Sequence, residues 1–352
     1  MDRSRGGRDL GRTLAVAGAA LLALLLIGRL IRSDLGPAEP GTPATTAAPA
    51  TTSERTPVLA AVDVGPGPAG RLAYGAGALW VVGDSGTLAR VDPATNRVAA
   101  TIRVAGGEAA ARAVVAGADA VWVAVASPGM LVRVDPATNR TTATVRLGRP
   151  LLDPVGVAAT DGAVWVTCCG RQVGGRLGGK LLRVDARTAK VTPVVLPREP
   201  LGIAADARQV WVSATDGSAV RVEPATGRVV GVYPGAPGGG IAQSVAVGAG
   251  SVWLAYPGGG VVARLDPENP AAVEPIRVDA ATIVTAGGGA VWAVATNDQG
   301  VVAIDPRRSA TVGGFSVSFV RDVRALAYGS GSLWVASGSS RVLRVDPGLL
   351  QP

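Results

Sequence analysis

The chain has 352 residues, 48% of them hydrophobic, and its 34 Lys and Arg against 26 Asp and Glu give a net charge of +8. It contains no histidine and only two cysteines, which are adjacent. This composition excludes catalysis or metal binding by histidine and a framework of disulfides between distant strands. The small basic excess is only a weak signal for an anionic partner.

A basic tail and an apolar run open the chain. Residues 1–12 contain four arginines, and residues 13–31 form a mostly apolar run whose one charged residue is Arg29, with a long side chain that can reach a membrane surface. Because more basic residues precede the run than follow it, we expect a signal-anchor helix with its N-terminus in the cytoplasm and the rest of the chain outside. A cleavable signal peptide is the alternative, although no small-x-small cleavage site closely follows the run.

Residues 32–57 are rich in Pro, Thr and Ala. Such a segment has too few large apolar residues to build a core. We therefore expect a linker that holds a single domain, residues 58–352, away from the membrane.

From residue 58 onward the chain consists of copies of one unit. Each copy has a tryptophan in a short Val-rich run between Gly- or Asp-containing turns, which indicates a strand. The spacing of 39 to 46 residues is typical of propeller blades. We interpret the tryptophans as core residues rather than a binding ring, because they recur in every copy: Trp80, Trp122, Trp165, Trp211, Trp253, Trp292 and Trp334.

An acidic residue followed by Pro comes twelve or thirteen residues after six of the seven tryptophans, as at Asp92 and Pro93. The acidic side chain caps its own turn, Pro fixes φ at the next position, and Asn96 can close the turn in the left-handed conformation. The third copy departs from this pattern, since Asp185 comes twenty residues after Trp165 and is followed by Ala.

Arginine stands two residues before the acidic turn residue in six copies. We interpret these side chains as a solvated or ion-paired row, with a basic binding ring as the alternative. They are Arg90, Arg133, Arg183, Arg221, Arg264 and Arg344.

The two ends of the domain complement each other. The last copy stops after its third strand, residues 342–345, while residues 58–64 match the fourth-strand pattern of residues 98–104. Strand edges that stay unpaired invite aggregation, so we expect the N-terminal strand to complete the last blade. The sequence thus predicts an all-β fold, a seven-bladed β-propeller closed by its N-terminal strand.

Candidate binding residues lie where the copies differ. In a propeller the second-to-third and fourth-to-first connections share one face, and we expect the ligand or partner there. The second-to-third connections supply Asp84, Cys168, Cys169, Arg171, Arg176, Asp216, Tyr256 and Asp298. The fourth-to-first connections supply Asp153, Arg198, Glu199, Gln243, Arg321 and Asp322.

The largest departure is the insertion at residues 168–179, which begins with Cys168 and Cys169. We expect it to form a loop that overhangs the binding face. A vicinal disulfide and a pair of thiols at a strand end both remain open, because an oxidising compartment favours the bridge and its strained geometry opposes it. Two cysteines are too few for a zinc site, so no metal is expected.

With its repeat in view, the domain resembles the YVTN and NHL class of β-propellers, including the streptogramin (virginiamycin B) lyase-like group. The resemblance lies in GAGALWVV at residues 75–82, LARVDPATNRVAATIRV at 88–104 and LVRVDPATNRTTATVRL at 131–147. The class includes lyases, extracellular sensor domains and binding proteins. Its lyase branch implies a histidine base with bound Mg²⁺, and this chain has no histidine to fill that role.

We therefore expect a sensor or scaffold domain at the cell envelope, with no catalytic residues and no cofactor. The expected partner is a protein or an anionic envelope polymer. A metal-assisted lyase or hydrolase that uses Asp or Glu is the alternative. Nucleic acid is not expected, because few aromatic residues are available to stack on bases.

Overall fold

The computed structural model describes residues 57–350 except 66, 68, 84–85, 107–110, 127, 149–152, 170–178, 297–299 and 317–321, and it leaves the side chains of Asp153 and Cys169 undescribed. The expected basic tail, membrane helix and nearly all of the linker lie outside these ranges. Within the described ranges, no helix is long and apolar enough to cross a membrane.

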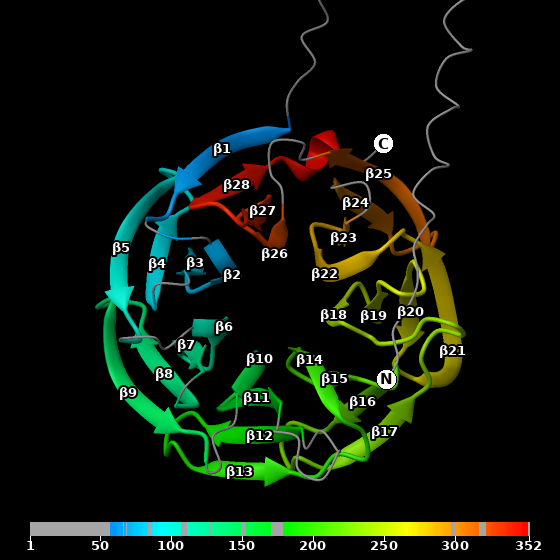
Figure 1. The fold of residues 1–352 in the computed structure, drawn as a ribbon, viewed down its shortest axis with the longest axis horizontal. Coiled ribbons are helices and arrows are strands. Elements are labelled where there is room, and N and C mark those ends of the chain that lie inside the picture. The colour runs from blue at the N-terminus through cyan, green and yellow to red at the C-terminus, as the bar shows by residue number, and fades with distance from the viewer. Residues whose placement is uncertain are drawn as a thin grey trace, which may run out of the picture. The chain divides into compact units, whose positions relative to one another are not determined.

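Seven antiparallel sheets of four strands stand around a ring, and each sheet is one blade (Figure 1). The predicted all-β, seven-bladed propeller is confirmed. Blade 1 comprises β2 (Ala69–Gly75), β3 (Ala78–Gly83), β4 (Thr87–Asp92) and β5 (Arg97–Arg103). Blade 2 comprises β6 (Ala111–Gly117), β7 (Ala120–Val125), β8 (Met130–Asp135) and β9 (Arg140–Arg146). Blade 3 comprises β10 (Asp153–Thr160), β11 (Ala163–Cys169), β12 (Lys180–Asp185) and β13 (Val191–Val194).

The remaining blades repeat this order. Blade 4 comprises β14 (Pro200–Ala205), β15 (Val210–Ala214), β16 (Ala219–Val222) and β17 (Val229–Tyr233). Blade 5 comprises β18 (Ser244–Gly248), β19 (Ser251–Tyr256), β20 (Val261–Asp266) and β21 (Asn269–Arg277). Blade 6 comprises β22 (Ala281–Gly287), β23 (Ala290–Ala295), β24 (Gly300–Asp305) and β25 (Ala310–Ser316). Blade 7 comprises β26 (Val323–Gly329), β27 (Ser332–Ser337), β28 (Arg341–Val345) and the N-terminal β1 (Val58–Asp63), and a short 3-10 helix (Pro347–Leu349) follows β28.

The ring closes through the N-terminal strand. Strand β1 pairs with β28 along Val62 and Val342, as the blue and red strands of Figure 1 show. The backbone N–H of Asp346 also donates to the carbonyl oxygen of Pro57 at 2.8 Å. The predicted closure is therefore confirmed.

Tryptophan forms the core of every blade. All seven tryptophans are buried, with at most 1% of their surface exposed, and the apolar clusters join side chains of neighbouring blades. One such cluster contains Trp80 and Val82 of blade 1 with Val121 and Val123 of blade 2. Burying a Trp hides about 150–250 Å², which corresponds to about 4–6 kcal/mol at about 25 cal/mol per Å². The interpretation of these residues as core is confirmed.

The repeated arginines stack on the tryptophans. Each guanidinium lies 5.3 to 5.9 Å from the centre of the Trp ring of its own blade. Most of them also reach the turn between the third and fourth strands of the next blade. Arg90 donates to the carbonyl oxygen of Pro136 at 2.9 Å and to Oδ1 of Asn139 at 3.0 Å, and Arg344 makes the same two contacts with Pro93 and Asn96 across the ring closure.

We expected a solvated or ion-paired row, and Arg221 and Arg264 do pair with Glu268 and Glu274. The contacts between neighbouring blades were not predicted. Arg133 of blade 2 is an exception to these contacts. The turn ahead of it, at Asp185, lacks both Pro and Asn, and Arg133 instead donates to Thr142 of its own blade while its buried Nε has no hydrogen-bond partner. The third copy has Ala189 at the position of Asn96 and Asn139, so its turn lacks the side-chain acceptor that Arg90 and Arg344 use in the next blade.

The acidic residues cap their turns as predicted. Oδ1 of Asp92 accepts a hydrogen bond from the backbone N–H of Ala94, and Oδ2 accepts one from the Thr95 hydroxyl. These two bonds, the backbone one first, lower the pKa of Asp92 below its ordinary value. Asn96 closes the turn at φ 56°, in the left-handed region.

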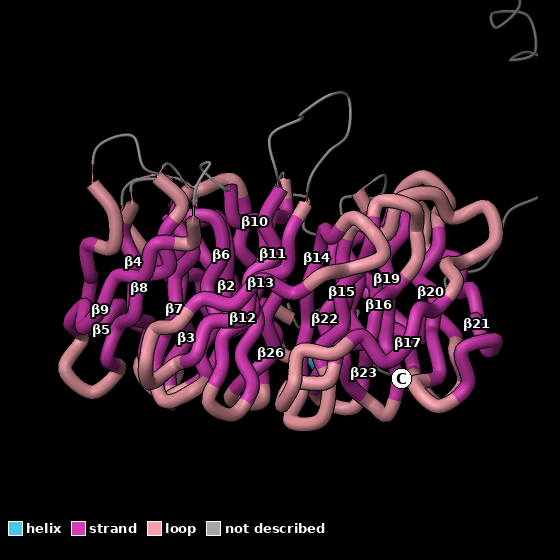
Figure 2. The backbone as a smooth tube through the Cα atoms, turned by 90° about the horizontal axis from the view of Figure 1, so that it is seen from below, coloured by secondary structure: helices cyan, strands magenta, loops and turns pink. Residues whose placement is uncertain are grey.

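The strands run between two layers of connections, seen edge-on in Figure 2. We call the layer of second-to-third and fourth-to-first connections the loop face, and the layer of hairpin turns the turn face. Backbone hydrogen bonds join the two kinds of connection on the loop face, as from Thr215 to Glu199 and from Gly338 to Asp322. The candidate connections therefore do share one face.

Candidate functional site

The two cysteines belong to a strand and not to the inserted loop. Residues 168 and 169 end β11, where they pair with Pro154 and Asp153 of β10, and Cys168 is fully buried in the core between blades 2 and 3. The expectation that Cys168 lines an overhanging loop is wrong, because β10 is long enough to extend the pairing that far. The disulfide stays a prediction, since the side chain of Cys169 is not described.

Several other candidates lie outside the described residues. They are Asp84, Arg171, Arg176, Asp298 and Arg321. The backbone of Asp153 is described, but its side chain is not.

The structure brings Asp216 and Glu199 together around the loop between β15 and β16. Nε of Arg198 lies 2.7 Å from Oδ2 of Asp216, with both side chains about half exposed at 47%. The backbone N–H of Thr215 donates to the carbonyl oxygen of Glu199 at 3.0 Å. These contacts tie the connection between blades 3 and 4 to the second-to-third loop of blade 4.

A second interblade connection holds the same loop from its other side. Residues 234–243, between β17 and β18, pack so closely that a Cβ on Gly217 would collide with the carbonyl oxygen of Gly240. Gly217 also has φ +85°, so both its conformation and its surroundings require glycine. The connection ends at Gln243, whose backbone N–H donates to Ala255 and whose side chain is exposed.

Tyr256 secures this second contact. Its hydroxyl donates to the carbonyl oxygen of Gly217 at 2.7 Å and lies 3.4 Å from the backbone N–H of Ala236, which donates to it. The side chain is fully buried, and burial raises the pKa of Tyr256 to about 12. The prediction that Tyr256 belongs to an exposed rim is wrong, because residues 234–243 cover it.

Two exposed apolar side chains flank this region. Val195 is 89% exposed in the connection before blade 4, and Ile241 is 53% exposed in the connection after it. Because both connections contact residues 215–217, we treat Val195, Arg198, Asp216 and Ile241 as one surface, the blade 4 rim. Neither apolar residue was predicted from the sequence, although residues 234–243 form the longest connection between consecutive blades.

Asp322 lies apart from the blade 4 rim, on blade 7. It adopts φ 69°, and its Oδ2 accepts a hydrogen bond from Nε of Arg324 at 2.8 Å. Its carboxylate is thus engaged by Arg324 of the adjoining strand β26.

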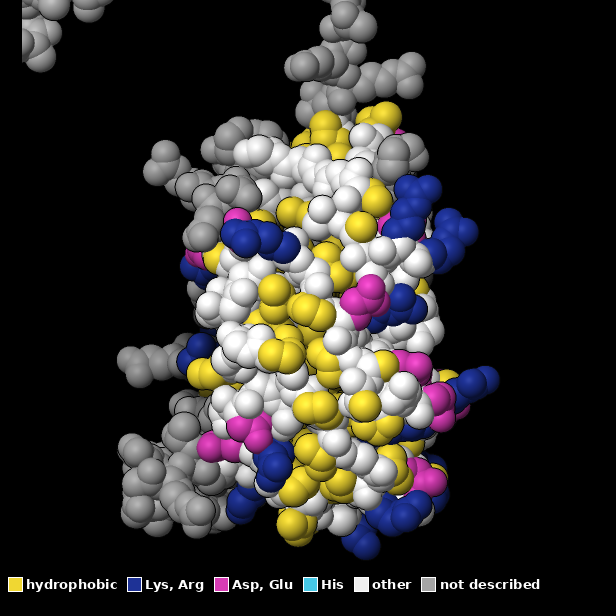
Figure 3. Space-filling model, turned by 90° about the vertical axis from the view of Figure 1, so that its right-hand side faces the viewer, with side chains coloured by type: hydrophobic (Ala, Val, Ile, Leu, Met, Phe, Trp, Pro, Cys, Tyr) yellow, Lys and Arg dark blue, Asp and Glu magenta, His cyan; other side chains and the backbone are white. Residues whose placement is uncertain are grey.

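The charges of the described surface are mixed. On the outer wall around β21 and β25, acidic, basic and apolar side chains are interspersed (Figure 3). The ion pairs of this region include Arg277 with Asp279 at 3.2 Å and Arg308 with Asp305 at 3.6 Å. Among the described residues, no group of three or more Cys, Asp or Glu side chains is placed to hold a metal ion.

Comparison with known proteins identifies the fold. The Pan2 WD40 domain of Neurospora crassa superposes with a TM-score of 0.63 at 13% identity, over 81% of this chain and 91% of that chain. The fold is shared. In all, 1652 chains of solved structures match, so the likeness does not distinguish one function from another. Neither a protein-family model nor a curated protein matches the sequence.

Proposed function

We propose that this protein is a membrane-anchored binding protein whose propeller lies outside the cytoplasm and docks a protein partner on the blade 4 rim. The observation that carries the proposal is the loop at residues 215–217, which two interblade connections hold from opposite sides while Val195 and Ile241 project into solvent. Rigid loops that present apolar side chains beside polar ones are typical of protein interfaces.

Charge favours a protein over an anionic polymer. Arg198, the basic residue of this rim, is paired with Asp216, so the rim offers no uncompensated row of cations. A polyanion binds through several uncompensated cations and not through one neutralised pair. The resemblance to the YVTN and NHL propellers, whose members include extracellular sensors and adaptors, supports the same assignment.

The anchor and the location are supported by the sequence alone. Residues 13–31 are long enough to span a bilayer, and the arginines of residues 1–12 favour a cytoplasmic N-terminus. Protease added to intact cells should digest residues 58–352. A propeller that stays protected until the cells are lysed would contradict this topology.

Affinity purification of the full chain from membranes of its own host tests the binding proposal. We expect one protein to co-purify with the wild type and to fall by about tenfold or more in the variant Val195→Asp with Ile241→Asp, because buried apolar anchors dominate interface energies. Val230→Asp is the matched control, since Val230 is 42% exposed on the outer strand β17. Equal recovery with all three proteins would reject the rim as the docking surface.

A further inference from the structure

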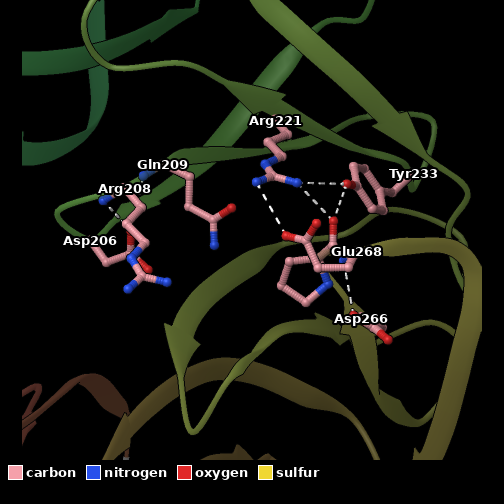
Figure 4. A network of polar contacts seen from close by, with 8 residues as sticks. Asp206, Arg208, Gln209, Arg221, Tyr233, Asp266 and Glu268 are labelled. Carbon is pink, nitrogen blue, oxygen red and sulfur yellow. Dashed lines mark hydrogen bonds and ion pairs between the residues drawn. The ribbon is translucent and has the colours of Figure 1, made fainter.

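A second polar site lies on the turn face, between blades 4 and 5. A cavity of about 290 Å³ opens there, and its lining includes Asp206, Arg208 and Gln209 from the first hairpin turn of blade 4, Arg221 from β16, and Asp266 and Glu268 from blade 5 (Figure 4). This site is separate from the blade 4 rim, which lies on the loop face.

Gln209 breaks the repeat at this point. The residue two positions before the Trp is Ala or Ser in the other six blades, as at Ala78 and Ser251, and only blade 4 has Gln. The Gln209 residue is just 8% exposed, and its buried Oε1 has no hydrogen-bond partner. A buried acceptor without a donor is costly, and the cavity beside Gln209 can supply a donor from water or from a ligand.

The turn before Gln209 is built to hold it in place. Oδ1 of Asp206 accepts hydrogen bonds from the backbone N–H groups of Arg208 at 2.8 Å and Gln209 at 2.9 Å. Blade 1 closes the same hairpin with positive φ at Ala76 and Gly77, whereas no residue of 206–209 has positive φ. Blade 4 therefore has a different turn, which carries Arg208 and Gln209 at the cavity.

A basic and an acidic side chain lie on either side of Gln209. Arg221 is already engaged, since it donates to the carbonyl oxygen of Pro267 at 2.8 Å, to the Tyr233 hydroxyl at 3.4 Å and to Glu268 at 3.4 Å. Among the described residues Arg208 forms no ion pair, and the Glu268 side chain is 82% exposed with only that long contact to Arg221. In Figure 4 the Gln209 carboxamide lies between Arg208 on one side and Glu268 on the other.

We propose that this cavity binds a small zwitterion that carries an ammonium and a carboxylate group, such as a free amino acid. The ammonium donates to Oε1 of Gln209 and pairs with Glu268, while the carboxylate pairs with Arg208. The volume, near the lower end of small-molecule sites, suits a ligand of this size. A neutral sugar would leave the opposed charges of Arg208 and Glu268 without counterparts.

Calorimetric titration of the purified full chain in detergent tests the proposal. The probes are the common L-amino acids, and the tightest of them is then compared with the matched amine that lacks its carboxylate and the matched acid that lacks its ammonium. For L-alanine these are ethylamine and propionate. We expect saturable binding of at least one amino acid and no binding of its matched acid.

Two variants separate the roles of the side chains. Gln209→Ser introduces the residue found at this position in blades 5 and 7, where Ser251 and Ser332 accept hydrogen bonds from Arg264 and Arg344, so the blade should fold. It should weaken amino-acid binding by roughly tenfold or more. Arg208→Ala should weaken the binding of the amino acid by a similar factor and leave the binding of the matched amine unchanged.

The control is Arg277→Ala, on exposed β21 away from the cavity, which should bind like the wild type. Three results would overturn the proposal. The first is that no amino acid binds, and the second is that glucose or inorganic phosphate binds instead. The third is that Gln209→Ser binds the amino acid as tightly as the wild type. Because the site is on the opposite face from the blade 4 rim, loss of partner docking and loss of zwitterion binding are separable outcomes.

Discussion

At the scale of single residues, one arginine in each of five blades performs two tasks. Arg90 lies 5.6 Å from the centre of the Trp80 ring and donates to two acceptors in the turn of blade 2. Its charge is therefore used inside the ring rather than offered to a ligand. The arginine row is part of the contact between blades, and blade 6, which has Ala303 at this position, does without it.

Arg90→Ala should destabilise the propeller more than Arg133→Ala. Both lose a similar stacking contact with Trp, at 5.6 and 5.8 Å, but only Arg90 also loses hydrogen bonds to the next blade. We expect the difference to be about 1–3 kcal/mol, measured as a lower melting temperature by circular dichroism. Equal losses in the two variants would mean that the contact with the next turn contributes nothing.

The capped turns should make the fold sensitive to acid. Asp92, Asp135 and Asp185 have pKa values below the ordinary 3.8, chiefly because backbone N–H groups donate to their carboxylates. A lowered folded-state pKa contributes stability that is complete above the unfolded-state value and is lost as the pH falls through the folded-state value. The melting temperature should therefore fall below about pH 4, and the triple Asp→Asn variant should show a shallower fall over the same range. An identical acid dependence in the two proteins would contradict this assignment.

The residues that repeat could be predicted from the sequence, but not all of their partners. The turn caps follow from local chemistry, so Asp92 and Asn96 were predicted correctly. The partner of Arg90 lies in the next blade, 46 residues away in the chain for Pro136, and only the ring geometry brings the two together. Gln209 differs from its counterparts in the sequence, but the cavity that it lines is formed only together with residues of the neighbouring blade 5.

At the scale of elements, residues 234–243 show how a connection becomes rigid without regular structure. They pack against Gly217 and are tied to Tyr256, which lies under them. The fold therefore fixes the position of Ile241 within the blade 4 rim.

Tyr256→Phe should loosen this connection. The change removes the hydroxyl that donates to Gly217 and accepts from Ala236, which leaves two buried backbone groups without their partner. We expect a loss of about 1–3 kcal/mol of stability and faster amide hydrogen exchange in residues 234–243. Unchanged exchange in these residues would show that packing alone holds the connection.

Deletion of residues 1–63 should lower the melting temperature severely, because it leaves β28 without the pairing that β1 provides. Deletion of residues 1–56 is the matched control and should melt like the intact propeller, since it keeps Pro57 and β1. If both truncations melt alike, ring closure by β1 is wrong.

Strand β1 could be predicted because it carries the fourth-strand pattern. The place of Cys168 could not, because its inclusion in β11 depends on the length of the partner strand β10.

At the scale of the whole molecule, the residues that repeat build the ring and the residues that vary are concentrated at its two faces. The loop face presents the blade 4 rim, and the turn face presents the cavity at Gln209. A closed ring with two differentiated faces is suited to holding a partner on one side and a small ligand on the other, while the expected anchor at residues 13–31 would keep both at the cell envelope.

Site-specific photocrosslinking tests the central claim, that the blade 4 rim docks a protein. A photoreactive amino acid placed at position 195 of the full chain, in its own host, should give one discrete protein adduct. Placed at position 230, on the outer strand β17, it should give none. Arg198→Glu, which sets two carboxylates against each other at Asp216, should remove the adduct from position 195. No adduct from position 195, or the same adduct from position 230, would contradict the account.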